Sequence, residues 1–191
     1  MSAPVEAVVV GASAGALGAL SAVLPVLPAG YPLPVMVVVH LPPDKKSAMA
    51  ELMQQKCRVA VREAEDKEPI RESTVYFAPP DYHLLVEPDR RLSLSGEEPV
   101  LFSRPSIDVL FETAADAYGE GLIGVILTGA NSDGAKGLRA VVGAGGTALV
   151  QRPDLAHASA MPHAALDACP TARPLSLPEL AAYLLECVTS A

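Results

Sequence analysis

Short apolar runs, rich in β-branched residues, alternate along this chain with segments that have helical spacing or helix-forming composition. A strand can be apolar throughout only when both faces of its sheet are covered, which is typical of parallel sheets with helices on each side. The runs occupy residues 7–10, 35–39, 122–127 and 147–150. Because strands and helices alternate, the sequence predicts an α/β fold with a doubly wound, mainly parallel sheet.

The expected helices follow these runs. Apolar residues recur at helical intervals from Leu17 to Leu24, where Pro25 ends the pattern. Further helices are predicted at residues 47–56, 105–118 and 134–142. Ser176 and Glu179 have the spacing of a capping box, in which each side chain binds the other's backbone N–H, and they predict a closing helix.

Residues 59–95 differ from the rest of the chain because their apolar segments are short and are separated by proline-containing pairs. The short pieces 75–78, 83–87 and 91–95 are separated by Pro79-Pro80 and by Pro88-Asp89. Such pairs are typical of turns between short strands. We predict a hairpin, or small antiparallel insertion, in this region.

Length and charge narrow the class of protein. The 191 residues contain no internal repeat or linker, which predicts a single domain spanning residues 1–191. The formal net charge of −8 argues against a nucleic-acid partner. No apolar run approaches the roughly 20 residues that a membrane span requires, and the N-terminus lacks a basic segment before a long apolar stretch. We therefore expect a cytoplasmic protein without direct membrane insertion.

The cysteines do not indicate a metal site. There are three, an odd number, and they lie far apart without a C-x-x-C pair or nearby histidines. We expect buried free thiols at Cys57, Cys169 and Cys187.

Three reactive side chains stand where predicted strands end. Ser13 lies in a G-x-S-x-G pattern after the first strand, His40 ends the second, and Asp133 follows the strand at 122–127. Functional groups gather beyond the carboxyl ends of the strands in such sheets. A serine, a histidine and a carboxylate suit nucleophilic catalysis, in which the imidazole takes the hydroxyl proton and the carboxylate orients the ring. Alternatively, Ser13 and Asp133 are helix N-caps and His40 is a turn residue.

Longer motifs surround these three residues. They are VVVGASAG at 8–15, VVVHLPP at 37–43, YFAPPDYHLLV at 76–86, RPSIDVLF at 104–111 and LTGANSDGAKG at 127–137. Together, and in this order, they resemble the catalytic domain of the chemotaxis protein-glutamate methylesterase (CheB-type) family over nearly the whole chain. These enzymes hydrolyse glutamate methyl esters on chemoreceptors.

The resemblance implies a serine esterase that needs no metal or organic cofactor. Ser13 would be the nucleophile, His40 the general base and then acid, and Asp133 the orienting carboxylate. Backbone N–H groups near Ala14 and Ala130 would form the oxyanion hole. The expected partners are the methylated cytoplasmic helices of chemoreceptors, with glutamine deamidation as a second activity of the family.

Three features depart from the family pattern. A threonine commonly follows the nucleophile, whereas Ala14 stands here. The loop before Asp133 usually reads Gly-Met-Gly, and here it reads Gly129-Ala130-Asn131, in which Asn131 can take a left-handed backbone conformation and the pocket wall is smaller. The usual receiver domain is not expected, because the chain begins almost at the first strand. Control is then expected from a separate regulatory protein, or is absent.

Two other functions are compatible with parts of the sequence. A Rossmann-type nucleotide binder would explain a glycine-rich turn, but G-x-G-x-x-G requires glycines where Ser13 and Ala16 stand, and His40 replaces the acidic residue that holds a ribose. A non-catalytic binding module on the same fold is the second alternative.

The remaining polar candidates are weaker. Arg104 precedes a predicted helix, where it could contact an acidic receptor surface or stay solvated. Packing or surface roles are expected for the other histidines, His83, His157 and His163.

Overall fold

The computed structural model describes residues 3–41 and 48–189. A parallel sheet of seven strands forms its centre, in the order β3-β4-β2-β1-β7-β8-β9. The strands are β1 (Ala7–Ala12), β2 (Val35–Val39), β3 (Ala60–Glu63), β4 (Thr74–Phe77), β7 (Leu122–Ile126), β8 (Thr147–Gln151) and β9 (Arg173–Leu175). The doubly wound α/β fold predicted from the sequence is confirmed.

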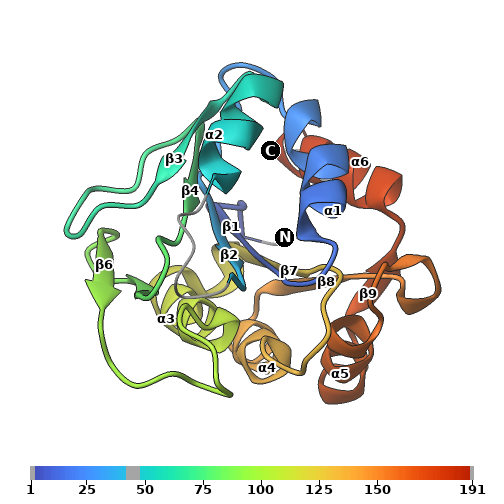
Figure 1. Ribbon diagram of the computed structural model, residues 1–191. Coiled ribbons are helices and arrows are strands. Elements are labelled where there is room, and N and C mark those ends of the chain that lie inside the picture. Colours follow the sequence, from blue (N-terminus) through green and yellow to red (C-terminus); the bar gives the residue numbers. More distant parts are fainter. Residues whose placement is uncertain (1–2, 42–47, 190–191) are drawn as a thin grey trace.

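Helices cover both faces of this sheet (Figure 1). One face carries α1 (Ala16–Val23), α2 (Met49–Lys56) and α6 (Leu177–Thr189), and the other carries α3 (Ile107–Tyr118), α4 (Ala135–Gly143) and α5 (Ala160–Ala168). Short 3-10 turns occur at η1 (Leu24–Val26), η2 (Gly119–Gly121) and η3 (Pro153–Leu155). Each face has its own apolar core, so β1, β2 and β7 are buried along their whole length, as uninterrupted apolar runs require.

The connections change face at the middle of the sheet. The helices that follow β1 and β2 lie on one face, whereas those that follow β7 and β8 lie on the other. Neighbouring strands whose chains leave in opposite directions open a crevice at their carboxyl ends. This switch point lies between β1 and β7, which are paired directly.

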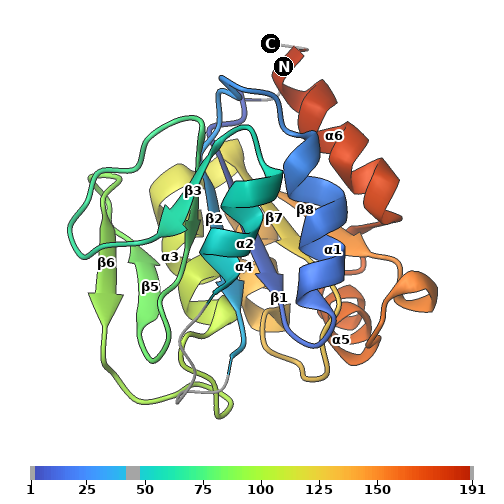
Figure 2. The same cartoon turned by 45° about the horizontal axis from the view of Figure 1, so that its top comes forward.

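The prediction for residues 59–95 was wrong in its first half. Strands β3 and β4 join the main sheet in parallel. Strand β3 was not predicted, because it is an edge strand with alternate positions exposed. Strand β4 was expected as the short piece 75–78, but it was assigned to the insertion because it is a buried run of only four residues. The second half was right: β5 (His83–Val86) and β6 (Leu92–Ser95) form an antiparallel hairpin, which lies beside α3 (Figure 2).

Other elements differ in smaller ways from the prediction. The capping box is present, because Ser176 Oγ accepts from Glu179 N–H at 3.2 Å and a Glu179 carboxylate oxygen accepts from Ser176 N–H at 2.7 Å. Helix α3 begins at Ile107, two residues later than predicted, and α2 begins at Met49. Ser47, its predicted first residue, lies outside the described residues. Helix α5 and strand β9 were not predicted.

The free cysteines also differ from expectation. Cys169 is buried, but Cys57 and Cys187 are half-buried, and burial raises the pKa of all three thiols. No helix in residues 3–41 and 48–189 combines the length and apolarity needed to cross a membrane.

Candidate active site

Ser13 and His40 directly follow two neighbouring strands, β1 and β2, at the carboxyl edge of the sheet. The last paired residues of β1 and β2 are Ala12 and Val39. Ser13 and His40 are the next residues of each strand, and His40 N–H donates to Ala12 O at 3.1 Å. On the other side, Ser13 N–H donates to Thr128 O at 2.9 Å. Ser13 therefore lies between the ends of β2 and β7, at the switch point.

The turn after Ser13 depends on a glycine. Gly15 has φ +86°, which L side chains rarely adopt, and a Cβ there would approach Cβ of His157 to 2.7 Å. Gly15 is also the N-cap of α1, and no side chain caps this helix. Ser13 is thus not a capping serine. Its side chain is half-buried.

Asp133 is buried and its carboxylate is saturated with donors. One oxygen, Oδ2, accepts from His40 Nε2 and from Ile107 N–H, both at 2.7 Å. The other, Oδ1, accepts from Ser106 Oγ and from Asp108 N–H, both at 3.0 Å. The N-cap interpretation of Asp133 is therefore wrong for the helix that follows it. Among the described residues, its carboxylate accepts from no N–H group of α4 and instead satisfies the first N–H groups of α3.

These contacts keep Asp133 ionised. Burial alone would raise the pKa of this carboxyl, but the hydrogen bonds from His40, Ile107 and Asp108 outweigh burial and lower the pKa below its usual value. The side chain of His40 is 11% exposed. Because Nε2 of His40 is bound to Asp133, Nδ1 is the ring nitrogen left to accept a proton.

Asn131 contributes a second contact to the ring. Its Nδ2 lies 3.3 Å from Nδ1 of His40, and its Oδ1 accepts from Asp133 N–H at 3.1 Å. The left-handed backbone suggested for this residue is wrong, because Asn131 is not among the described residues with positive φ. Its side chain, not its backbone, distinguishes it from a glycine.

Ala14 and Ala130 are both exposed at the same edge. Neither Ala14 N–H nor Ala130 N–H donates a hydrogen bond to any described residue. The Ala14 carbonyl is held by the Thr128 hydroxyl, which donates to it at 2.8 Å and accepts from Ala158 N–H at 2.8 Å. Thr128 thereby ties the Ser13 turn to the loop before α5.

Sequence reasoning missed several residues that position the site. Ser106, Thr128 and Asp108 were not singled out, although Ser106 and Asp108 lie in RPSIDVLF and Thr128 lies in LTGANSDGAKG. Ser106 and Asp108 both bind residues of LTGANSDGAKG. Ser106 Oγ donates to Asp133 at 3.0 Å, and Asp108 Oδ1 accepts from Gly134 N–H at 2.9 Å and from Gly137 N–H at 2.7 Å. The only sequence signal for these three residues was that they lie within the motifs.

The other histidines have packing or surface roles, as expected. His83 is buried, with Nε2 bound to Glu98 O at 2.9 Å and Nδ1 accepting from Ser106 N–H at 3.1 Å. His157 is exposed and lies against Gly15, and His163 is exposed on α5. Arg104 donates to Asp81 at 2.7 Å and to Gly96 O at 3.0 Å, and its side chain is 23% exposed.

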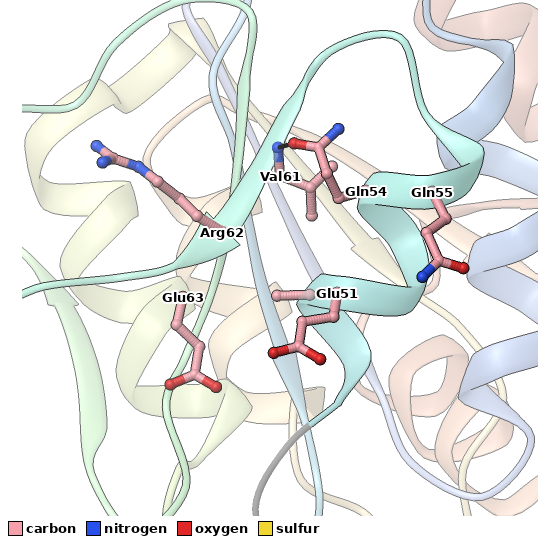
Figure 3. Close-up of a pocket in the computed structure, with 7 residues that line it drawn as sticks. Glu51, Gln54, Gln55, Val61, Arg62 and Glu63 are labelled. Carbon is pink, nitrogen blue, oxygen red and sulfur yellow. Dashed lines mark hydrogen bonds between the residues drawn. The ribbon is translucent and has the colours of Figure 1, made fainter.

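One hollow lies beside these residues and a larger one lies apart from them. A small one of about 60 Å³ adjoins the site and is lined by His40, Leu41, Phe102, Ser103, Arg104 and Pro105. A wider groove of about 660 Å³ lies between α2 and β3 (Figure 3) and is lined by Ala50, Glu51, Gln54, Gln55, Val61, Arg62 and Glu63. Among the described residues that line it there is no serine, cysteine or histidine, so this part of the groove lacks a nucleophile with its base. In the described part of the chain, no cluster of three or more His, Cys, Asp or Glu side chains could hold a metal ion.

Comparisons with known proteins identify the family and the fold. The sequence model of the family described as CheB methylesterase matches residues 8–184. A "Putative protein-glutamate methylesterase/protein-glutamine glutaminase" from Leptospira interrogans is 47% identical over 92% of this chain and 91% of its own length. A protein-glutamate methylesterase/protein-glutamine glutaminase from Symbiobacterium thermophilum is 40% identical over 78% of this chain but only 41% of its own length.

A solved structure supports the fold. The Thermotoga maritima CheB methylesterase catalytic domain superimposes with a TM-score of 0.91 at 30% identity, covering 96% of this chain and 99% of that domain. Neither the nucleotide-binding alternative nor the non-catalytic module is favoured by these comparisons.

Proposed function

Because this chain belongs to the CheB methylesterase family, we propose that it hydrolyses methyl esters on glutamate side chains of chemoreceptors through Ser13, His40 and Asp133. The observation that carries the proposal is the 2.7 Å contact between His40 Nε2 and a buried, ionised Asp133, next to Ser13 at the end of the neighbouring strand. Residues 1–191 are proposed to form one catalytic domain.

The first half of the reaction forms an acyl-enzyme. The Ser13 hydroxyl transfers its proton to Nδ1 of His40 as its oxygen attacks the ester carbonyl. Asp133 holds the ring through Nε2 and stabilises the imidazolium. The tetrahedral intermediate collapses when the C–O bond to the methoxy group breaks, and methanol leaves with the proton from His40.

The second half restores the enzyme. Water gives a proton to Nδ1 of His40 and attacks the acyl carbonyl, and the proton returns to Ser13 as the C–O bond to the serine breaks. The product is a glutamate side chain. The N–H groups of Ala14 and Ala130, which donate to no described residue, support both tetrahedral intermediates as an oxyanion hole.

The proposed partner is a methylated receptor helix, which lies in the cytoplasm. A second activity, hydrolysis of glutamine amides with release of ammonia, uses the same acyl-enzyme, and relatives carry the name protein-glutamine glutaminase as well. A separate protein is proposed to regulate access to the site.

The test compares methanol release from methylated receptor by wild type, Ser13→Ala and His40→Asn. Both variants are expected to lose at least about 10³-fold in rate, because the nucleophile or its base is gone. His163→Asn is the matched control, since His163 is exposed on α5, and its rate should equal that of wild type. Equal release by wild type and Ser13→Ala contradicts the mechanism, and no release by folded wild type favours the binding module.

A further inference from the structure

The side chain of Asn131 has a defined orientation. A backbone N–H can only donate, so the Asn131 atom that lies 3.1 Å from Asp133 N–H is the amide oxygen. The NH₂ group is therefore the part that faces Nδ1 of His40 at 3.3 Å. Asn131 is half-buried, and its contact with Asp133 N–H anchors the amide plane.

The protonation of the His40 ring follows from its other neighbour. The Asp133 carboxylate accepts from Ser106, Ile107 and Asp108 in addition to His40, and its pKa is lowered, so it carries no proton. Nε2 of His40 must then be the donor in the bond to Asp133. In a neutral ring the lone pair lies on Nδ1, which is the atom that the Asn131 NH₂ group faces.

We propose that Asn131 is an occluding residue, whose amide occupies the proton-accepting nitrogen of His40 until the Ser13 hydroxyl displaces it. The inference rests on the proposed function. At 3.3 Å the bond lies at the long end for N–H donors, so it is weak enough to yield. While Nδ1 is unprotonated, the Asn131 NH₂ group competes with Ser13 for its lone pair. Once Nδ1 is protonated, two N–H groups face each other, and this contact disfavours the charged form of the ring.

Two substitutions at Asn131 should act in opposite directions. Asn131→Ala removes the competing donor and should speed attack by Ser13 about 2- to 10-fold, the range expected for one ordinary hydrogen bond. Asn131→Asp keeps an acceptor for Asp133 N–H but presents a carboxylate to Nδ1. This group favours a protonated Nδ1, which cannot accept from Ser13, so attack should slow by at least about 10-fold.

The readout is the second-order rate of reaction with a fluorophosphonate probe. Ser13 Oγ bonds to phosphorus, fluoride leaves, and the serine proton passes to His40, so the rate reports the base directly. Ser132→Ala is the matched control, because Ser132 is an exposed neighbour in the same loop; its rate should equal that of wild type. A purely structural role of Asn131 predicts slower reaction in both variants, and that result overturns the inference.

A spectroscopic measurement tests the wild type without any variant. Imidazole ¹⁵N shifts of His40 near neutral pH should show a protonated Nε2 and an unprotonated Nδ1 that accepts a hydrogen bond; a protonated Nδ1 overturns the inference. The Nδ1 resonance should move toward that of an unbonded nitrogen in Asn131→Ala. Failure of folded wild type to label at Ser13 contradicts the proposed function itself, whereas labelling of wild type without acceleration in Asn131→Ala contradicts only the inference.

Discussion

Asp133 concentrates four hydrogen bonds on one buried side chain. Two donors reach each oxygen, three of them from the start of α3 and one from His40. A carboxylate can accept all four, because it has acceptor sites on both oxygens and no proton. An amide at this position has only one oxygen and brings its own donors. The site therefore requires the charge and not merely the shape of an aspartate.

Asp133→Asn is expected to lose both activity and stability. Its NH₂ group would face N–H donors, which costs about 1 to 3 kcal/mol of unfolding free energy, and His40 would lose the acceptor that fixes its tautomer, which costs on the order of 10³ to 10⁴ in rate. Initial rates of ester hydrolysis and thermal unfolding measure the two effects. Asp116→Asn, an exposed residue of α3, controls for the change in charge. Hydrolysis within tenfold of wild type would show that Asp133 has no orienting role.

The sequence alone could identify those site residues whose position follows from the end of a predicted strand. Ser13, His40 and Asp133 each follow an apolar run, so their common edge followed from the fold class. Ser106, Thr128 and the Asn131 amide act across elements. Their roles depend on which helix start approaches which loop, and a pattern of local periodicities does not contain that information.

Helices α3 and α4 cap each other rather than themselves. Neither helix has a side-chain cap at its own N-cap residue. Asp133, just before α4, accepts from the first N–H groups of α3, and Asp108, near the start of α3, accepts from Gly134 and Gly137 at the start of α4. The exchange fixes the two helix starts relative to one another and places two carboxyls close together.

Asp108 should make stability depend on pH. Burial raises its pKa to about 6; the neighbouring Asp133 adds to this effect, and the N–H bonds from Gly137 and Gly134 oppose it. In the unfolded chain an aspartate has a pKa of about 3.9. The folded state thus binds more protons between about pH 4 and 6, and this contribution to stability is lost as pH rises through that window.

Asp108→Asn keeps an acceptor oxygen but cannot ionise. Its unfolding free energy should lack the decline that wild type shows from about pH 4 to 6, and at pH 7 it should equal wild type or exceed it by up to about 3 kcal/mol. Urea unfolding at several pH values measures the difference. A decline as steep as that of wild type would assign the pH dependence to other groups.

Elements were predicted well where burial made them long and uniform. Strands β1, β2 and β7 are central and apolar throughout, so their sequence signal was strong. Strand β9 has three residues, two of them exposed, and α5 has Pro162 in its first turn. These elements are defined by their neighbours in the fold and lack a strong local pattern.

At the scale of the whole molecule, the edge of the sheet at β3 is covered by a side chain. Gln54 of α2 accepts from Val61 N–H at 2.9 Å (Figure 3). It also donates to Val59 O at 3.3 Å. The amide thus satisfies backbone groups that an unpaired edge would offer to another chain. None of the described residues that line the groove beside it belongs to the candidate site.

The spacing between the sheet and α3 links the fold to the chemistry. Gly11 of β1 lets Ile107 approach so closely that an added Cβ would lie 2.5 Å from Cγ2 of Ile107. Ile107 also donates its N–H to Asp133. A side chain at position 11 must push the start of α3 away from the sheet, and with it the group that holds Asp133.

Gly11→Ala should therefore lower the unfolding free energy by about 1 to 3 kcal/mol, as overpacking does, and should also slow labelling of Ser13 by the fluorophosphonate probe. Gly18→Ala is the matched substitution, because Gly18 lies within α1 with open space around its Cβ position. It should raise stability by up to about 1 kcal/mol through helix propensity and leave labelling unchanged. Thermal unfolding and probe kinetics on both variants distinguish the cases. If the two alanines behave alike, the contact between Gly11 and Ile107 does not set the geometry of the site.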